Sequence, residues 1–203
     1  MKKMFALLLA LSLLVNCFVV MAEAAKEEKP IFDGTVFKGL DGYEYDKFED
    51  TWSYYQAFVK KYSDGRLIIG INIFGDENGI SYAPSLYIKL LDNSGNPIST
   101  IKSVDFLIDD TKFSYKSMLE DDDSSSVLLG QEGKQIIDAF AKCESVSVKI
   151  TMSRGDLKAD LDQTEVNKTL KKIAKELLKN NVWDYITDPF VNTFESFYPL
   201  TIK

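Results

Sequence analysis

A series of short apolar segments, separated by Asp, Asn and Gly turns, is the feature that most constrains how this chain folds. The first segment begins at Thr51, and four more follow at Arg66–Phe74, Ser81–Leu91, Ile98–Ile108 and Lys112–Leu119. Strand-length segments at intervals of about ten residues, joined by turn residues, are typical of an antiparallel meander. In the first segment Trp52, Tyr54 and Phe58 alternate with Tyr55, Ala57 and Val59, so both faces are apolar. We therefore expect this strand inside a sandwich or under a helix.

The pattern changes after the acidic loop 120–126. Val127–Leu129 is a candidate short strand, and Gln131–Lys142 carries apolar residues on one face, which predicts a helix of about three turns. Ser145–Met152 alternates and predicts a return to the sheet.

The most regular helix pattern comes last. Asp162 and Glu165 match a capping box, and Asn180-Asn181 marks the end of the helix. One apolar face follows helical spacing, and it comprises Val166, Leu170, Ile173, Ala174, Leu177 and Leu178. We expect the aromatic tail from Val182 onward to pack back on the sheet. The order of elements predicts an α+β fold, with an antiparallel β-sheet or sandwich of about seven strands packed with C-terminal helices.

The N-terminal residues have the layout of a secretory signal. Lys2 and Lys3 precede an apolar run, and Ala22-Glu23-Ala24 places small residues at the two positions that a signal peptidase recognises. We expect a signal peptide at 1–24, a short tether at 25–32 and a single exported α+β domain at 33–203. The predicted location is secreted, periplasmic or at the cell surface. Lipidation at Cys17 is a less favoured alternative, because Asn16 is a poor residue before a modified cysteine and apolar residues follow it.

Composition excludes several classes of chemistry. The chain has no histidine, so Ser-His-Asp and Cys-His catalysis and the usual catalytic zinc sites are not expected. Its formal net charge is −7, which argues against nucleic acid as a partner. Cys143 is the single cysteine after the signal, so it has no intramolecular disulfide partner, and we expect it to be buried.

A cluster of aromatic residues within 43–62 is the best candidate for a ligand site. Aromatic faces match the C–H faces of sugar rings, and Tyr and Trp also suit protein interfaces. The alternative is that most of these side chains fill the core, since they alternate at strand spacing. The candidate ligand-binding residues are Tyr43, Tyr45, Trp52, Tyr54 and Tyr55.

A stripe of lysines on the last helix is a candidate surface for a protein partner, an anionic lipid or a polyanion. The alternative is the solvated side of an amphipathic helix. The stripe consists of Lys168, Lys171, Lys172, Lys175 and Lys179.

Neither acidic run predicts a metal site. Glu120–Asp123 and Asp76–Asn78 lack the spacing of a calcium loop, and turn chemistry explains both. Ser99 and Lys102 match S-x-x-K, but they begin a predicted strand, where the two side chains point to opposite faces.

The favoured function is therefore an exported, non-catalytic binding or interaction module of the bacterial cell envelope, with a polysaccharide or protein partner and no cofactor. The alternatives are an envelope-associated hydrolase that uses acidic residues, and an inhibitor or assembly factor that acts through an edge strand or the lysine stripe.

Overall fold

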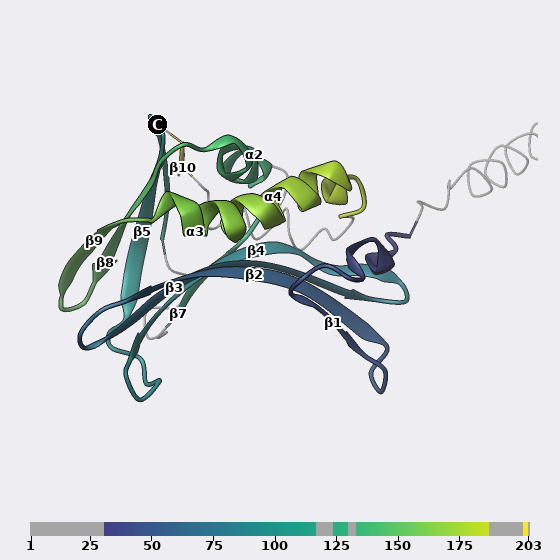
Figure 1. Cartoon of the computed structure of the whole chain (residues 1–203), viewed down its shortest axis with the longest axis horizontal. Coiled ribbons are helices and arrows are strands. Elements are labelled where there is room, and N and C mark those ends of the chain that lie inside the picture. The colour runs from purple at the N-terminus through teal and green to yellow at the C-terminus, as the bar shows by residue number, and fades with distance from the viewer. Residues whose placement is uncertain (1–30, 117–123, 130–132, 187–200, 203) are drawn as a thin grey trace, which may run out of the picture. The chain divides into compact units, whose positions relative to one another are not determined.

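The computed structural model describes residues 31–116, 124–129, 133–186 and 201–202 (Figure 1). Within these residues, two antiparallel five-stranded sheets are accompanied by helices from the C-terminal half. The described residues belong to one compact unit, Ile31–Lys203. The predicted α+β class is confirmed.

The first sheet has the strand order β1-β2-β3-β4-β7. Its strands are β1 (Tyr43–Asp46), β2 (Thr51–Lys61), β3 (Gly65–Asp76), β4 (Gly79–Asp92) and β7 (Ser124–Leu128). The second sheet has the order β10-β6-β5-β8-β9. Its strands are β10 (Thr201–Ile202), β6 (Thr111–Lys116), β5 (Ile101–Ile108), β8 (Val146–Met152) and β9 (Gly155–Asp160).

The described part of the chain holds ten strands, against about seven expected from the sequence. The additional strands are β1, β9 and β10. Two of them are mostly polar, with the sequences YEYD and GDLKAD, and the third has only two residues. A polar edge strand gives little alternation of apolar residues, so pattern alone does not reveal it.

The helices lie together on one side of the first sheet (Figure 1). They are the 3-10 helix η1 (Gly34–Phe37), α2 (Lys134–Lys142), α3 (Gln163–Lys168), α4 (Leu170–Lys179) and the 3-10 helix η2 (Val182–Asp184). Helix α4 contacts β2 and β3 directly, and α2 packs on α4. The covered face of β3 is an uninterrupted apolar row of Leu67, Ile69, Ile71 and Ile73, all fully buried.

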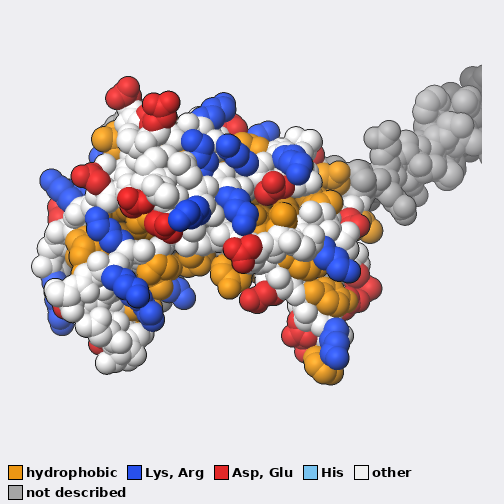
Figure 2. All heavy atoms as spheres, in the orientation of Figure 1, with side chains coloured by type: hydrophobic (Ala, Val, Ile, Leu, Met, Phe, Trp, Pro, Cys, Tyr) orange, Lys and Arg blue, Asp and Glu red, His pale blue; other side chains and the backbone are white. Residues whose placement is uncertain are grey.

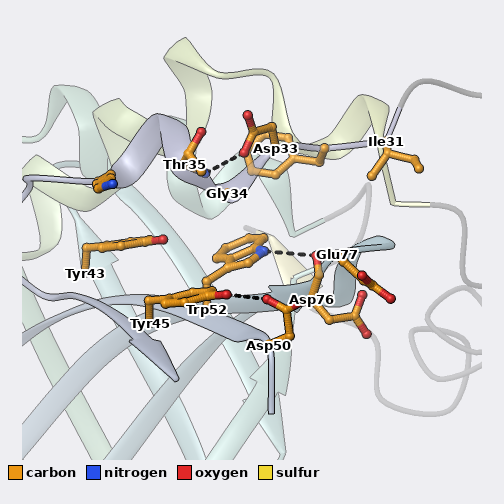
Figure 3. A pocket seen from close by; sticks show the side chains of 12 residues that line it. Ile31, Asp33, Gly34, Thr35, Tyr43, Tyr45, Asp50, Trp52, Asp76 and Glu77 are labelled. Atoms are coloured by element: carbon orange, nitrogen blue, oxygen red, sulfur yellow. Dashed lines mark hydrogen bonds between the residues drawn. The ribbon is translucent and has the colours of Figure 1, made fainter. Parts of the chain in front are cut away.

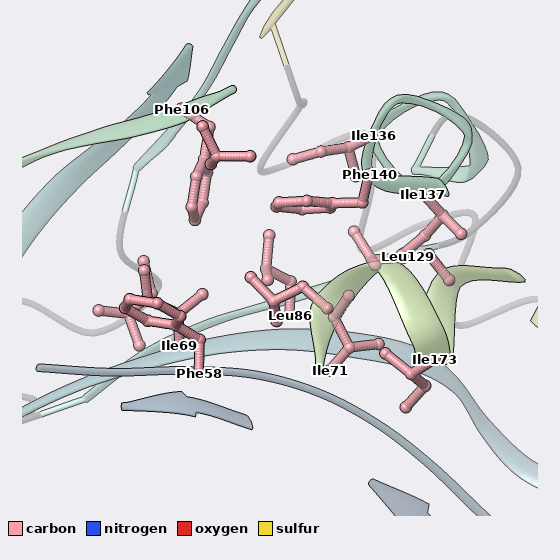
Figure 4. Close-up of a cluster of buried hydrophobic side chains, with 14 of the residues drawn as sticks. Phe58, Ile69, Ile71, Leu86, Phe106, Leu129, Ile136, Ile137, Phe140 and Ile173 are labelled. Carbon is pink, nitrogen blue, oxygen red and sulfur yellow. The ribbon is translucent and has the colours of Figure 1, made fainter. Parts of the chain in front are cut away.

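One hydrophobic core joins the two sheets and the helices (Figure 4). Phe58 and Ile71 come from the first sheet, Phe106 from the second, Phe140 from α2 and Ile173 from α4. The rings of Phe106 and Phe140 meet edge to face at 5.6 Å between centroids. Cys143 is buried, as expected, and its Sγ donates to the Phe140 carbonyl oxygen at 3.2 Å.

The last helix is divided in two, whereas the sequence predicted one continuous helix. Asp162 caps its start, accepting from the Glu165 N–H at 3.0 Å. Thr169 then departs from helical geometry, with φ −119° and ψ −92°. Its Oγ1 donates to the Glu165 carbonyl oxygen at 2.6 Å, and this kind of back-bonding bends helices. The Glu165 side chain forms an ion pair with Lys168 at 2.9 Å.

The outer face of β2 is more exposed than its sequence suggested. Trp52, Tyr54 and Phe58 are buried as a set, which confirms the alternation. Tyr55 and Val59 on the opposite face are 40% and 46% exposed. The first sheet therefore has one buried face in the described structure, and the helices cover that face.

Part of the aromatic tail packs on the core, as expected. The Trp183 indole N–H donates to the Leu129 carbonyl oxygen at 2.9 Å, and the Tyr185 ring meets Phe32 at 5.1 Å. Thr201 and Ile202 pair with β6 of the second sheet, whereas residues 187–200 and 203 of the tail and the acidic run 120–123 lie outside the described residues. Within the described residues, no helix combines the length and the apolar character needed to cross a bilayer.

Candidate functional site

A cleft of about 460 Å³ opens between η1 and the edge of the first sheet (Figure 3). We call it the η1 cleft. Its walls come from three places in the sequence: the segment 31–38, the hairpin of β1 and β2, and the turn after β3. It therefore depends on the pairing of β2 with β3, which sets Trp52 opposite Gly75 and Thr51 opposite Asp76.

Two tyrosines of β1 form the open wall of the η1 cleft. Tyr43 and Tyr45 are two residues apart, so their side chains leave the strand on the same face. Tyr45 is paired with Trp52 and Tyr43 with Tyr54, which places the indole next to the tyrosine rings. Tyr45 is 54% exposed, so its ring is available to a ligand.

Trp52 forms the inner wall and is held by aromatic neighbours. Its ring centroid lies 5.8 Å from that of Phe32 and 6.0 Å from that of Phe37. Its indole N–H donates to the Asp76 carbonyl oxygen at 3.3 Å. Gly34 allows η1 to approach the indole closely, because a Cβ at that position would lie 2.2 Å from the ring atoms. The indole is 6% exposed, so only a small part of it borders the cleft.

Four carboxylates also line the cleft: Asp33, Asp50, Asp76 and Glu77. Asp33 caps η1, accepting from the Thr35 N–H at 2.8 Å, and the hydrogen bonds from Thr35 lower the pKa of its carboxyl group. Asp50 accepts a hydrogen bond from the Tyr45 hydroxyl, and this bond raises the pKa of the Tyr45 phenol.

The turn residues that carry these acids have defined local geometry. Asp50 ends the β1–β2 turn with φ 53°, a left-handed conformation that Asp tolerates better than most residues. Asp76 Oδ1 accepts from the Asn78 N–H at 2.7 Å, which shapes the β3–β4 turn. Asp33 and Asp76 are therefore held by N–H groups of their own turns, and Asp50 by the hydroxyl of Tyr45, while all three line the same cleft.

The structure separates the five candidate aromatic residues. Tyr43, Tyr45 and Trp52 lie together in the η1 cleft. Tyr54 is fully buried and stacks on Phe37 at 4.7 Å, so its ring serves packing. Tyr55 points to the opposite face of the sheet and does not border the cleft. The sequence did not predict the acidic residues of the cleft, because Asp and Glu are common in turns and turn formation alone accounted for them.

The lysine stripe lies over α3 and α4, where Figure 2 shows basic side chains with acidic ones among them. Lys168 and Lys179 pair with acids of their own helices at 2.9 and 3.3 Å. Lys172 lies 3.9 Å from Asp41. Lys171 donates to the Cys143 carbonyl oxygen at 2.7 Å, just after the end of α2. Lys175 is exposed. Binding of a partner by this stripe stays a prediction, and four of its members already have contacts within the chain.

The η1 cleft is the principal candidate for a functional site. Among the described residues, no group of three or more Cys, Asp or Glu side chains is placed to hold a metal ion. Comparison with protein-family models, with curated proteins and with solved structures finds no match to this chain. The functional argument therefore depends on the geometry of the cleft.

Proposed function

We propose that this chain is an exported, non-catalytic binding module of the bacterial cell envelope, and that it binds carbohydrate in the η1 cleft. The observation that carries the proposal is the open wall made by Tyr43 and Tyr45, backed by Trp52. Its export is inferred from the N-terminal sequence pattern.

The chemistry of the cleft suits a sugar. The face of an aromatic ring carries partial negative charge, so it attracts the slightly positive C–H face of a pyranose. Carboxylates are acceptors only, and they match the hydroxyl donors at the rim of a sugar ring. The cleft places Tyr45 and Asp50 side by side, joined by a hydrogen bond, and so offers both kinds of contact at one point.

The electrostatics of Asp33 do not suit it to the role of general acid in hydrolysis. A glycosidase needs one carboxylic acid that stays protonated, which requires a raised pKa. At Asp33 the hydrogen bonds from Thr35 lower the pKa of the carboxyl group. This is the opposite of what a general acid needs.

Calorimetric titration of the purified protein with peptidoglycan fragments and a panel of polysaccharides tests the proposal. We expect saturable binding of one saccharide class, weakened about tenfold by Tyr45→Ala, since a stacked aromatic ring contributes about 1 kcal/mol or more. Tyr45→Phe keeps the ring and removes only the bond to Asp50, so it should retain most of the affinity.

Tyr55→Ala is the matched control, because Tyr55 is similarly exposed but lies on the other face of the sheet. It should leave the affinity unchanged. An equal loss in the Tyr45→Ala and Tyr55→Ala variants would remove the η1 cleft as the ligand site. No binding across the panel would reject carbohydrate as the ligand.

A further inference from the structure

The η1 cleft also indicates the charge of its ligand. We propose that the saccharide bound there carries an ammonium group, as in a hexosamine whose amine is free. This inference rests on the proposed carbohydrate function and makes it more specific.

The cleft gathers negative charge that no ion pair among the described residues neutralises. Asp33, Asp50, Asp76 and Glu77 line it, and among the described residues that line it Lys38 is the single basic one. The five ion pairs within the described residues all lie elsewhere, so no described basic side chain lies within 4.0 Å of these four carboxylates. A cationic group of a ligand would supply the missing partner.

The hydrogen bonds within the cleft leave the carboxylates able to accept more. In the bonds from Thr35, Tyr45 and Asn78, each of the three aspartates accepts through Oδ1. An ionised carboxylate has about four acceptor positions, so an ammonium group can be added without breaking these bonds. These hydrogen bonds therefore hold the three aspartates in place before a ligand arrives.

The aromatic wall favours the same charge. A cation within about 6 Å of a Trp or Tyr ring centroid is attracted by the negative face of the ring. Burial, and to a lesser extent the nearby Asp33 charge, raises the pKa of the Tyr43 phenol, so this ring adds no negative charge of its own. Ring faces and carboxylates meet at the pair formed by Tyr45 and Asp50.

Two disaccharides with the same backbone provide the test. Glucosamine dimer has free amines, and its di-N-acetylated form is neutral, so the two differ in the proposed group. Titrations at mildly acidic pH, where the amines are protonated, should show about tenfold tighter binding of the free-amine form. The preference should decrease with added salt, since exposed charges are screened.

Substitution by Asn separates charge from shape. Asp50→Asn and Asp76→Asn each retain an oxygen that accepts the local hydrogen bond, from Tyr45 or Asn78, but remove the negative charge. The double variant should lose the preference for the free amine. Asp64→Asn makes the same type of change in the β2–β3 turn, outside the cleft, and should retain the preference.

The outcomes distinguish this inference from the proposed function. Equal or tighter binding of the N-acetylated form, weakened by Tyr45→Ala, would overturn the ammonium inference and leave carbohydrate binding in place. Binding of tetralysine but of neither disaccharide would overturn both, because the ligand would then be a cationic peptide. An undiminished preference for the free amine in the Asp50→Asn, Asp76→Asn double variant would show that the ammonium group binds elsewhere on this acidic protein.

Discussion

Gly34→Ala provides a direct test of how η1 and Trp52 build the cleft. Gly34 is the first residue of η1 and is buried beside the indole. On backbone grounds alone, replacing a glycine in a helical turn by alanine should raise the free energy of unfolding by about 0.5–1 kcal/mol. The new Cβ, however, would lie 2.2 Å from Cδ2 and Cε2 of Trp52, whereas carbon atoms in contact are normally about 3.5–4.0 Å apart.

The indole has little room to give way. It is packed against Phe32 and Phe37 and hydrogen-bonded to the Asp76 carbonyl oxygen. Overpacking of a tight core costs about 1–3 kcal/mol, and a lost hydrogen bond costs about 1 kcal/mol more. After the backbone gain is subtracted, we expect Gly34→Ala to lower the free energy of unfolding by about 1–3.5 kcal/mol and to shift the tryptophan emission.

Urea unfolding followed by circular dichroism measures the change. Gly39→Ala is the matched control, because Gly39 lies just after η1 and a Cβ added there would meet no atom within 4 Å. Its φ of 84° still disfavours alanine, so we expect a loss of about 1 kcal/mol and no change in emission. A Gly34→Ala protein as stable as the wild type would refute the close contact between η1 and Trp52.

Three further predictions follow from buried or hydrogen-bonded groups. Tyr54→Phe should leave the urea midpoint unchanged or raise it, because the Tyr54 hydroxyl is buried without a hydrogen-bond partner among the described residues. Burial, with the charges of Glu176 and Asp41, raises the pKa of this hydroxyl to about 12. A clear decrease in the urea midpoint would reveal a hydrogen-bond partner. Asp109→Ala should lower the free energy of unfolding by about 1–2 kcal/mol at neutral pH. Asp109 accepts from the N–H groups of Glu144 and Ser145 at 2.9 and 2.8 Å, and these bonds lower the pKa of its carboxyl group. The contribution of Asp109 to stability is therefore complete above its pKa in the unfolded chain, near 3.9, and is lost as the pH falls through its pKa in the folded protein. Equal losses of stability in Asp109→Ala at neutral and at strongly acidic pH would contradict this prediction. Burial raises the pKa of the Cys143 thiol, so a thiol reagent should label it slowly in the native protein at neutral pH and rapidly in urea; fast native labelling would contradict its burial.

The sequence predicted most of the first sheet because its strands are long and apolar and are separated by turn residues. Alternation along β2 correctly placed Trp52, Tyr54 and Phe58 on one face. Alternation did not reveal how deeply each tyrosine is buried. Tyr54 of β2 stacks on Phe37, whereas Tyr45 lies on β1 at the edge of the sheet. Alternation specifies a face, and the elements packed on that face determine exposure.

The site was partly predictable for a similar reason. The density of aromatic residues in 43–62 pointed to Tyr43, Tyr45 and Trp52, which the structure brings together. Asp33, Asp50 and Asp76 occur at three separate turns, and turn geometry alone accounts for an aspartate at each position. Asp33 and Asp76 accept hydrogen bonds from nearby backbone N–H groups, and Asp50 adopts a left-handed turn conformation. The pairing of β1, β2 and β3, together with the packing of η1 on β2 and β3, is needed to show that these turns meet at one cleft.

Emission of Trp52 is the most direct test that the η1 cleft binds a ligand. The chain has two tryptophans, and Trp183→Phe leaves Trp52 as the only tryptophan, which can be excited selectively over the tyrosines. Titration of this variant with a saccharide that binds the unmodified protein should give a saturable change in Trp52 emission, with the same midpoint as the calorimetric titration. The change should weaken in parallel with the affinity when Tyr45→Ala is added. Calorimetric binding with no change in Trp52 emission would contradict the account, because the ligand would then occupy a surface away from the cleft.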